Sequence, residues 1–238
     1  MKLQIGRRAL LTLVGLTIWA LPALAIPELQ LYVEGSTYDA STETWVTNSS
    51  NFKLWVIGDV SAKGTILNVH IAAAFLTGEV GTITLTPTTT SLLTDPSTPS
   101  VPTYHAGLGA DGTIPKLDDG TDLPSHGIYK AGTSWNQYDI GNLSLKDSPI
   151  GDFITSYPAS FPDMGQINVY DVSITGYSMV HFDTYNHIQG KKKMMYVNAP
   201  FSHDSEGTPS VPEPASLLLL GLGMGGSALV GLRRRVKR

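Results

Sequence analysis

The stretch Asn51-Phe-Lys-Leu-Trp-Val-Ile57 decides the fold class of this chain. It is rich in β-branched and aromatic residues, and Gly58-Asp59 ends it, which is typical of a buried strand followed by a turn. Leu29, Leu31 and Val33 alternate with less apolar residues before it, and Thr82–Thr86 alternates in the same way after it. A period of two residues indicates strands with one buried face.

Further short apolar runs continue this pattern along the chain. No long apolar stripe with a helical period of 3.6 residues occurs between residues 26 and 205, so we expect an all-β, jelly-roll-like β-sandwich or a related barrel. Short helices are expected near Ala72–Leu76 and near Ile150–Thr155. The further strand candidates are Ile66–Ile71, Ile167–Val172, Tyr177–Phe182 and Met194–Val197.

The N-terminus has the three parts of a signal peptide. Lys2, Arg7 and Arg8 are basic, Ala9–Leu21 is apolar, and Ala23-Leu24-Ala25 has small residues at the two positions that signal peptidase reads. We therefore expect residues 1–25 to be removed and the mature chain to start at Ile26. The alternative is an uncleaved N-terminal anchor.

The C-terminus carries a second targeting segment. Pro212-Glu213-Pro214 precedes the charge-free apolar segment Ala215–Leu232, and residues 233–238 hold five cations. As a helix, residues 215–232 would be about 27 Å long, which nearly equals the hydrocarbon thickness of a bilayer. We therefore predict one transmembrane helix at residues 215–232 with its basic end in the cytoplasm.

This order of motif, apolar helix and basic end resembles the PEP-CTERM sorting signal of Gram-negative bacteria. The resemblance implies cleavage near Pro212, Glu213 and Pro214 by an exosortase, a membrane-embedded cysteine transpeptidase. It also implies export across the inner membrane, a transient stay there, and delivery to the cell surface or an exopolysaccharide matrix. The alternative is a simple membrane anchor that is never cut.

After the signal peptide we expect one domain at residues 26–205, a linker at residues 206–211 and the sorting signal at residues 212–238. The chain has 16 Lys and Arg and 20 Asp and Glu, but three cations lie in residues 1–25 and five in residues 233–238. Residues 26–214 therefore carry a net charge of −12 and no Arg. Such a domain lacks the basic surface that nucleic acids require. The chain has no Cys, which excludes disulfides, thiol nucleophiles and Cys-type zinc sites.

An acidic, glycine-containing stretch is the candidate metal site. Asp111, Asp118, Asp119 and Asp122 could offer carboxylate oxygens to calcium, although their spacing does not fit an EF-hand. The alternative is a solvated turn, in which Asp and Gly are favoured for local reasons. No other cofactor is expected.

The six histidines show no metal-binding or catalytic motif. His181 and Asp183 would share a face of a strand, so they could form part of a metal site or a catalytic pair, or they could be ordinary polar residues. There is no Gly-x-Ser-x-Gly motif, and 20 acids make a chance carboxylate pair almost certain. We therefore predict no catalytic residues. The other histidines are His70, His105, His126, His187 and His203.

Residues 29–204 also resemble a choice-of-anchor domain, a group of exported bacterial domains that occur with alternative C-terminal sorting signals. The resemblance rests on residues 29–39, 123–128, 147–152 and 199–204, and it implies no particular activity. It suggests that five polar residues in these stretches converge, namely His126, Asp147, Asp152, His203 and Asp204.

Together these observations predict a non-enzymatic surface or matrix protein with a structural or adhesive role linked to exopolysaccharide or biofilm. Signal peptidase and an exosortase are the expected processing partners, and extracellular polysaccharide is a candidate ligand. Two alternatives stay open. One is a secreted hydrolase that acts on matrix polysaccharide, and the other is a calcium- or glycan-binding module, for which three Trp and ten Tyr could supply stacking surfaces.

Overall fold

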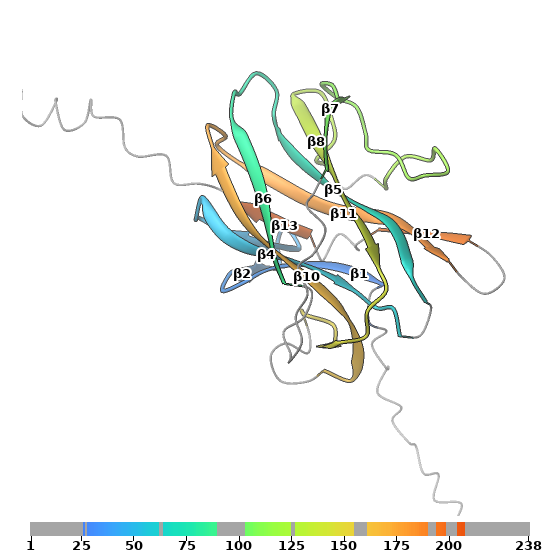
Figure 1. Ribbon diagram of the computed structural model, residues 1–238. Coiled ribbons are helices and arrows are strands. Elements are labelled where there is room, and N and C mark those ends of the chain that lie inside the picture. The colour runs from blue at the N-terminus through green and yellow to red at the C-terminus, as the bar shows by residue number, and fades with distance from the viewer. Residues whose placement is uncertain are drawn as a thin grey trace, which may run out of the picture.

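The computed structural model describes residues 26, 28–61, 64–89, 103–124, 127–154, 161–189, 194–198 and 204–207. Within these residues the chain forms strands β1 to β13 and no helix. The strands build two sheets that pack face to face (Figure 1). The prediction of an all-β sandwich is therefore confirmed.

The first sheet is antiparallel throughout. It has the order β1-β4-β10-β6, and β9 pairs with one end of β10. The stretch that begins at Asn51 forms β4, which lies between two neighbours and is buried from Leu54 to Gly58. The strands are β1 (Leu29–Val33), β4 (Asn51–Gly58), β6 (Thr82–Thr89), β9 (Ser148–Ile150) and β10 (Asp163–Thr175).

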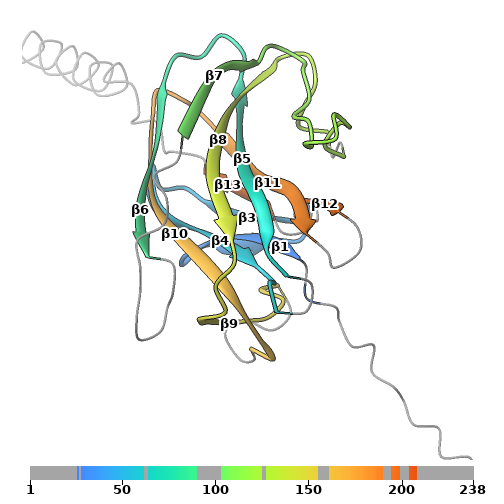
Figure 2. The same cartoon turned by 45° about the vertical axis from the view of Figure 1, so that its right-hand side comes forward.

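The second sheet is larger and has the order β2-β3-β13-β11-β5-β8-β7, with β12 paired to β11 (Figure 2). Its pairs are antiparallel except for β13 and β3, which run parallel. The strands are β2 (Thr37–Asp39), β3 (Thr44–Thr47), β5 (Ile66–Leu76), β7 (Thr103–Gly109), β8 (Thr133–Leu143), β11 (Val180–Gln189), β12 (Met194–Asn198) and β13 (Asp204–Gly207).

The main core lies between the two sheets. Leu54 and Val56 of β4 and Tyr170 of β10 face Ile71 of β5 and Phe182 of β11, and all five are at most 2 % exposed. Alternate residues of each strand supply this core because successive side chains point to opposite faces. Burying a large apolar side chain contributes about 1.5–3 kcal/mol to folding.

The outer face of the first sheet is buried as well. Trp55 and Tyr32 make edge-to-face ring contacts at a centroid distance of 5.2 Å, and Phe153 covers both rings. Gln30 holds the covering chain in place, since its Nε2 donates to the carbonyl of Gly151 at 2.9 Å and its Oε1 accepts the N–H of Phe153 at 3.0 Å. This second layer explains why every residue of β1 is buried.

The prediction of a short helix near Ala72–Leu76 is wrong, because these residues form the second half of β5. Ala72 and Ala74 point away from the main core and leave room for large side chains on the outer face. Near Ile150 the chain ends β9 and enters a turn, and no helix is present through Ile154, beyond which the predicted segment lies outside the described residues.

The domain extends beyond residue 205. Glu206 and Gly207, which lie in the predicted linker, belong to β13, and Ser205 is fully buried. The predicted signal peptide with Ala23 and Ala25, and the segment 212–238, lie outside the described residues. No helix in the described part of the chain is long and apolar enough to cross a membrane.

Candidate functional site

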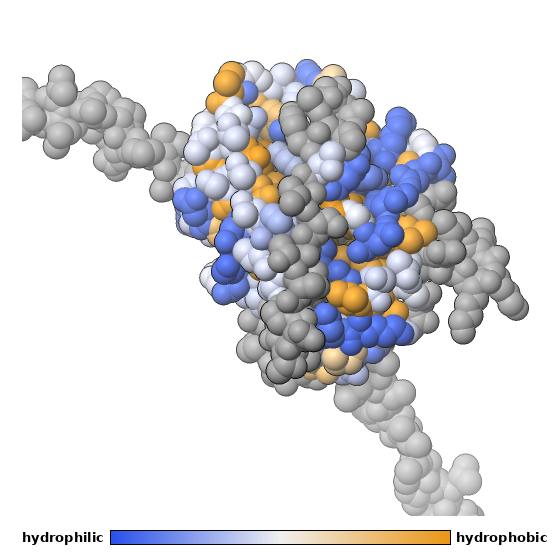
Figure 3. All heavy atoms as spheres, viewed as in Figure 1, coloured by the Kyte–Doolittle hydropathy of each residue, from blue (hydrophilic) through white to orange (hydrophobic). Residues whose placement is uncertain are grey.

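A polar cluster lies on the outer face of the second sheet, beneath the connection between β7 and β8. We call the described residues of this connection, 110–124 and 127–132, the covering segment. Its apolar side packs on the sheet, where Leu123 and Tyr129 contact a layer that includes Ala72, Trp135 and Tyr185. Its solvent side is hydrophilic, as the upper right of Figure 3 shows. The acidic stretch is therefore amphipathic rather than a free solvated loop.

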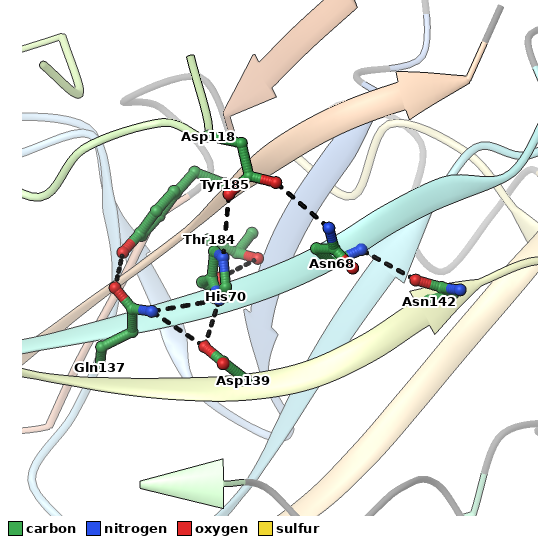
Figure 4. Close-up of polar contacts among 8 residues, drawn as sticks. All are labelled: Asn68, His70, Asp118, Gln137, Asp139, Asn142, Thr184 and Tyr185. Atoms are coloured by element: carbon green, nitrogen blue, oxygen red, sulfur yellow. Dashed lines mark hydrogen bonds and ion pairs between the residues drawn. The ribbon is translucent and has the colours of Figure 1, made fainter. Parts of the chain in front are cut away.

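His70 is the centre of the cluster and lies between two carboxylates (Figure 4). Its Nδ1 forms a hydrogen bond with Oδ1 of Asp139, and its Nε2 lies 3.6 Å from Oδ1 of Asp118. The His70 side chain is 11 % exposed, whereas the two carboxylate side chains are 32 % and 34 % exposed. The carboxylates therefore lie at the boundary between the buried ring and solvent.

The strand register brings the other members of the cluster to this ring. His70 of β5 pairs with Asp139 of β8 on one side and with Tyr185 of β11 on the other. The Tyr185 hydroxyl donates to Oε1 of Gln137 at 2.9 Å, and Nε2 of Gln137 donates to Oδ1 of Asp139 at 2.9 Å. A continuous hydrogen-bonded chain thus crosses three neighbouring strands.

An irregularity in β5 connects the cluster to the covering segment. The register between β5 and β8 shifts on both sides of Val69, and Asn68 has a positive φ of 48°. Such bulges re-aim a side chain. The Asn68 N–H donates to Oδ1 of Asn142 at 2.8 Å, and its Nδ2 donates to Oδ2 of Asp118 at 3.2 Å. Asp118 is therefore bound to β5 through both Asn68 and His70.

A second polar group lies deeper in the same face. Nε2 of His181 is 3.6 Å from Oδ1 of Asp183, and both side chains are at most 5 % exposed. The prediction that these residues share a face is confirmed. The Tyr129 hydroxyl of the covering segment donates to Oδ2 of Asp183, and Oε2 of Glu206 lies 3.9 Å from Nδ1 of His181. This group therefore connects the covering segment, β11 and β13.

The buried tyrosines Tyr170 and Tyr185 make stability sensitive to high pH. Burial raises the pKa of both hydroxyls above the ordinary value of 10.0, and the carboxylates of Asp139 and Asp183 add to the effect at Tyr185. Both hydroxyls stay neutral in the folded state, while the unfolded state ionises them. Their stabilisation is complete below pH ~10 and is lost as the pH rises, by about 2 kcal/mol for each at pH ~11.5.

We expect urea unfolding to show this loss between pH ~9 and ~11.5. The variant with Tyr170→Phe and Tyr185→Phe should lose about 4 kcal/mol less over the same range. It starts from a lower stability, because the hydrogen bonds from Tyr185 to Gln137 and from Asn168 to Tyr170 are missing. An equal loss in the variant and the natural chain would contradict the assignment.

The four predicted calcium ligands do not converge. Asp111 accepts hydrogen bonds from the N–H of Gly132 at 2.7 Å and from the Thr77 hydroxyl at 2.8 Å, so it ties the covering segment to the loop that follows β5. Asp119 accepts from Thr121, which holds the pKa of its carboxyl below the usual range. No group of three or more acidic or histidine side chains that could hold a metal ion occurs among the described residues.

The remaining predicted residues are only partly placed. Asp122 pairs with Lys116, and Asp118 belongs to the cluster described above. Asp152 accepts the N–H of Ile154 at 2.9 Å, on the opposite sheet from His70. The predicted convergence of Asp147 and Asp152 with His126, His203 and Asp204 is untested, because the two histidines and the side chain of Asp204 lie outside what the structure describes.

Sequence reasoning missed the pairing of His70 with Asp139. The alternation Trp135, Gln137, Asp139 does place these three side chains on one face of a strand. Nothing in the sequence shows that β5 is the neighbour of β8, or that the covering segment folds back to bring Asp118 to the same ring.

The arrangement of this cluster leaves little space between its carboxylates. The His70 ring fills the space between Asp118 and Asp139, so a glycosidic bond cannot lie between these two carboxylates. The Thr184 hydroxyl donates to the backbone carbonyl of His70 at 3.0 Å and not to its ring. The hydrogen bonds of the cluster instead fix the covering segment to the sheet.

The C-terminal residues decide where the protein is sent. Residues 210–235 match the family model of the PEP-CTERM protein-sorting motif. The chain carries a PEP-CTERM sorting motif. The PEP-CTERM motif implies that the protein is exported and processed by an exosortase, as the resemblance predicted. It begins three residues after Gly207, the last residue of β13.

Two solved structures are similar in part. The collagen-binding subdomain of the Enterococcus faecalis surface protein ACE is 9 % identical, with a TM-score of 0.28, and the match covers 77 % of this chain and 98 % of that chain. The C-terminal domain of the Streptococcus agalactiae AgI/II polypeptide BspA is 10 % identical, with a TM-score of 0.21, and the match covers 75 % and 49 %. The comparison with curated proteins gave no match.

Proposed function

We propose that this PEP-CTERM protein is a non-enzymatic structural or adhesive component of the extracellular matrix, associated with exopolysaccharide or biofilm. The observation that carries this proposal is the sorting motif placed directly after the last strand of a β-sandwich. Exosortase processing would deliver the sandwich to the outside of a Gram-negative cell, and the acidic charge would keep it soluble there.

The polar residues of the outer face support a role without catalysis. The two histidine groups bind the covering segment to the sheet through carboxylates and a tyrosine, which uses their hydrogen-bonding capacity inside the domain. A rigid sandwich whose strand connections are fixed in this way is suited to be displayed outside the cell and to make repeated contacts with the matrix.

Association with the matrix can be tested in the native host. Cells expressing the full chain are separated into cytoplasm, membranes, extracellular polysaccharide and medium, and the protein is measured in each. We expect it to sediment with the polysaccharide and to be released when the polysaccharide is digested. A strain without the protein should retain less polysaccharide at the cell surface. Recovery of the protein in the medium alone, with unchanged polysaccharide, would contradict the proposal.

The two other functions give different results in the same material. A hydrolase would release new reducing ends from the purified polysaccharide. A calcium-binding module would show a higher melting temperature with calcium than with a chelator, and its carboxylates would come from the exposed side of the covering segment, where Asp119 and Asp122 lie. We expect neither change.

A further inference from the structure

Strand β13 fixes the point at which the chain leaves the domain. It is hydrogen-bonded on both sides, with Gly207 paired to Thr47 of β3 and to Val180 of β11. Gly207 is buried, and a β-carbon there would lie 2.9 Å from Phe52 and 3.0 Å from Ile174. The start of the tether to the sorting motif is therefore set by the interior of the sandwich.

The tether is short. Pro212 follows Gly207 by five residues, which span at most about 18 Å when fully extended. The predicted membrane helix starts at Ala215, within about 28 Å of the same point. While an enzyme in the membrane processes the motif, the end of the sandwich that carries Gly207 must lie against or very near that enzyme.

Three loops form this end, which we call the tethered end. The pairing of β13 places the β3–β4 loop (residues 48–50) and the β10–β11 loop (residues 176–179) beside Gly207. The β5–β6 loop (residues 77–81) adjoins them, since Thr82 pairs with Thr175. All three lie at the upper left of Figure 1.

The three loops of the tethered end carry little charge, although residues 26–214 carry a net charge of −12, and the carboxylate of Asp111 in the covering segment adjoins them through the hydrogen bond from the Thr77 hydroxyl. Glu79 is the one charged residue of the three loops, and its carboxylate accepts the N–H of Ser178 at 3.1 Å. Val80 is 89 % exposed and Leu76, just before the loop, is 44 % exposed. A surface with exposed apolar residues and few charges favours contact with a protein at the membrane, because it costs little desolvation.

A hollow adjoins these residues. It has a volume of about 560 Å³ and is open to solvent, and its lining combines the apolar side chains of Phe75, Tyr177 and Val80 with polar residues that include Glu79. The rings of Phe75 and Tyr177 contact each other at a centroid distance of 4.4 Å, which makes the wall rigid. A protruding apolar side chain of a partner would fit such a hollow.

We propose that the tethered end is the docking surface for the exosortase that processes the sorting motif. The short tether forces this end towards the enzyme, and its exposed apolar residues and low charge permit the contact. Specificity for this substrate would then come from the sandwich as well as from the motif.

The matched variants use the most exposed apolar side chains of the two ends. Val80→Asp with Leu76→Asp places charge at the tethered end, and Leu145→Asp with Met164→Asp does the same at the opposite end, where these residues are 38 % and 37 % exposed. In the native host, we expect the first pair to lower the processing rate of the full chain about five- to tenfold, as the loss of one apolar anchor does. The control pair should be processed like the natural chain.

Two further measurements separate docking from other causes. Twelve Gly and Ser residues inserted after Thr208, before the matched region 210–235, should restore processing of the Val80→Asp and Leu76→Asp variant, because the longer tether no longer forces the charged surface against the enzyme. A photo-crosslinking residue at position 80 should capture the exosortase, and one at position 145 should not. Normal processing of the first pair, no rescue by insertion, or crosslinks only to lipid would overturn the proposal. Replacement of Pro212-Glu213-Pro214 tests recognition of the motif separately, so failure of the docking proposal is distinguishable from failure of the exosortase assignment on which it rests.

Discussion

Replacing Pro212-Glu213-Pro214 with three alanines will leave the full-length protein in the inner membrane, and the processed form will fall below detection. The physical reason is that the apolar segment 215–232 stays attached when the motif is not cut. Partition of such a segment into the bilayer is effectively irreversible. The measurement is cell fractionation of the native host, with the protein detected by an antibody against the sandwich.

The matched control for this prediction is Pro209→Ala. Pro209 lies in the tether but one residue before the matched region 210–235. This variant should be processed and delivered normally. If the triple-alanine variant reaches the cell surface in the processed form, exosortase recognition of the motif is contradicted. Delivery without any cut would instead favour the simple anchor.

Asp183→Ala will destabilise the domain by about 3–5 kcal/mol, whereas Asp139→Ala will cost about 1–2 kcal/mol. Asp183 is buried, and its carboxylate accepts from the Tyr129 hydroxyl and faces His181. Removing the Asp183 side chain takes this carboxylate away from two buried groups, the Tyr129 hydroxyl and the His181 ring. The side chain of Asp139 is 34 % exposed, so water replaces much of what His70 and Gln137 lose.

Urea unfolding of the two variants measures this difference. The double variant with Asp183→Ala and Tyr129→Phe should lose less than the sum of the two single losses, because both changes remove the same hydrogen bond. Additive losses would show that Tyr129 and Asp183 do not interact. Equal losses for Asp183→Ala and Asp139→Ala would contradict the role of burial.

The hydrophobic periodicity predicted the sandwich, because this periodicity is a property of residues close together in the sequence. The alternation of Leu29, Leu31 and Val33, and the apolar run of β4, depend only on residues close in sequence. The helix expected at Ala72–Leu76 was wrong because small residues suit a helix locally. In the folded domain, Ala72 and Ala74 lie on the outer face of β5, where their small side chains leave room for Tyr129 and Trp135.

The candidate site was not accessible to the same reasoning. His70 meets Asp139 and Asp118, which lie 69 and 48 residues later in the chain. Their contact depends on the order of the strands and on the return of the covering segment. Of the predicted pairs, only His181 and Asp183 could be placed together from sequence, because they are two residues apart on one strand.

The sequence by itself determined the class of fold, the acidic charge of the domain and the sorting motif that implies its export. These follow from composition, local periodicity and short motifs that a partner reads as a linear chain. Only the tertiary structure decided that β13 lies in the middle of a sheet and that an end with few charges and exposed apolar residues adjoins the tether. Strand pairing joins residues far apart in the chain, and its free energy depends on all of them at once.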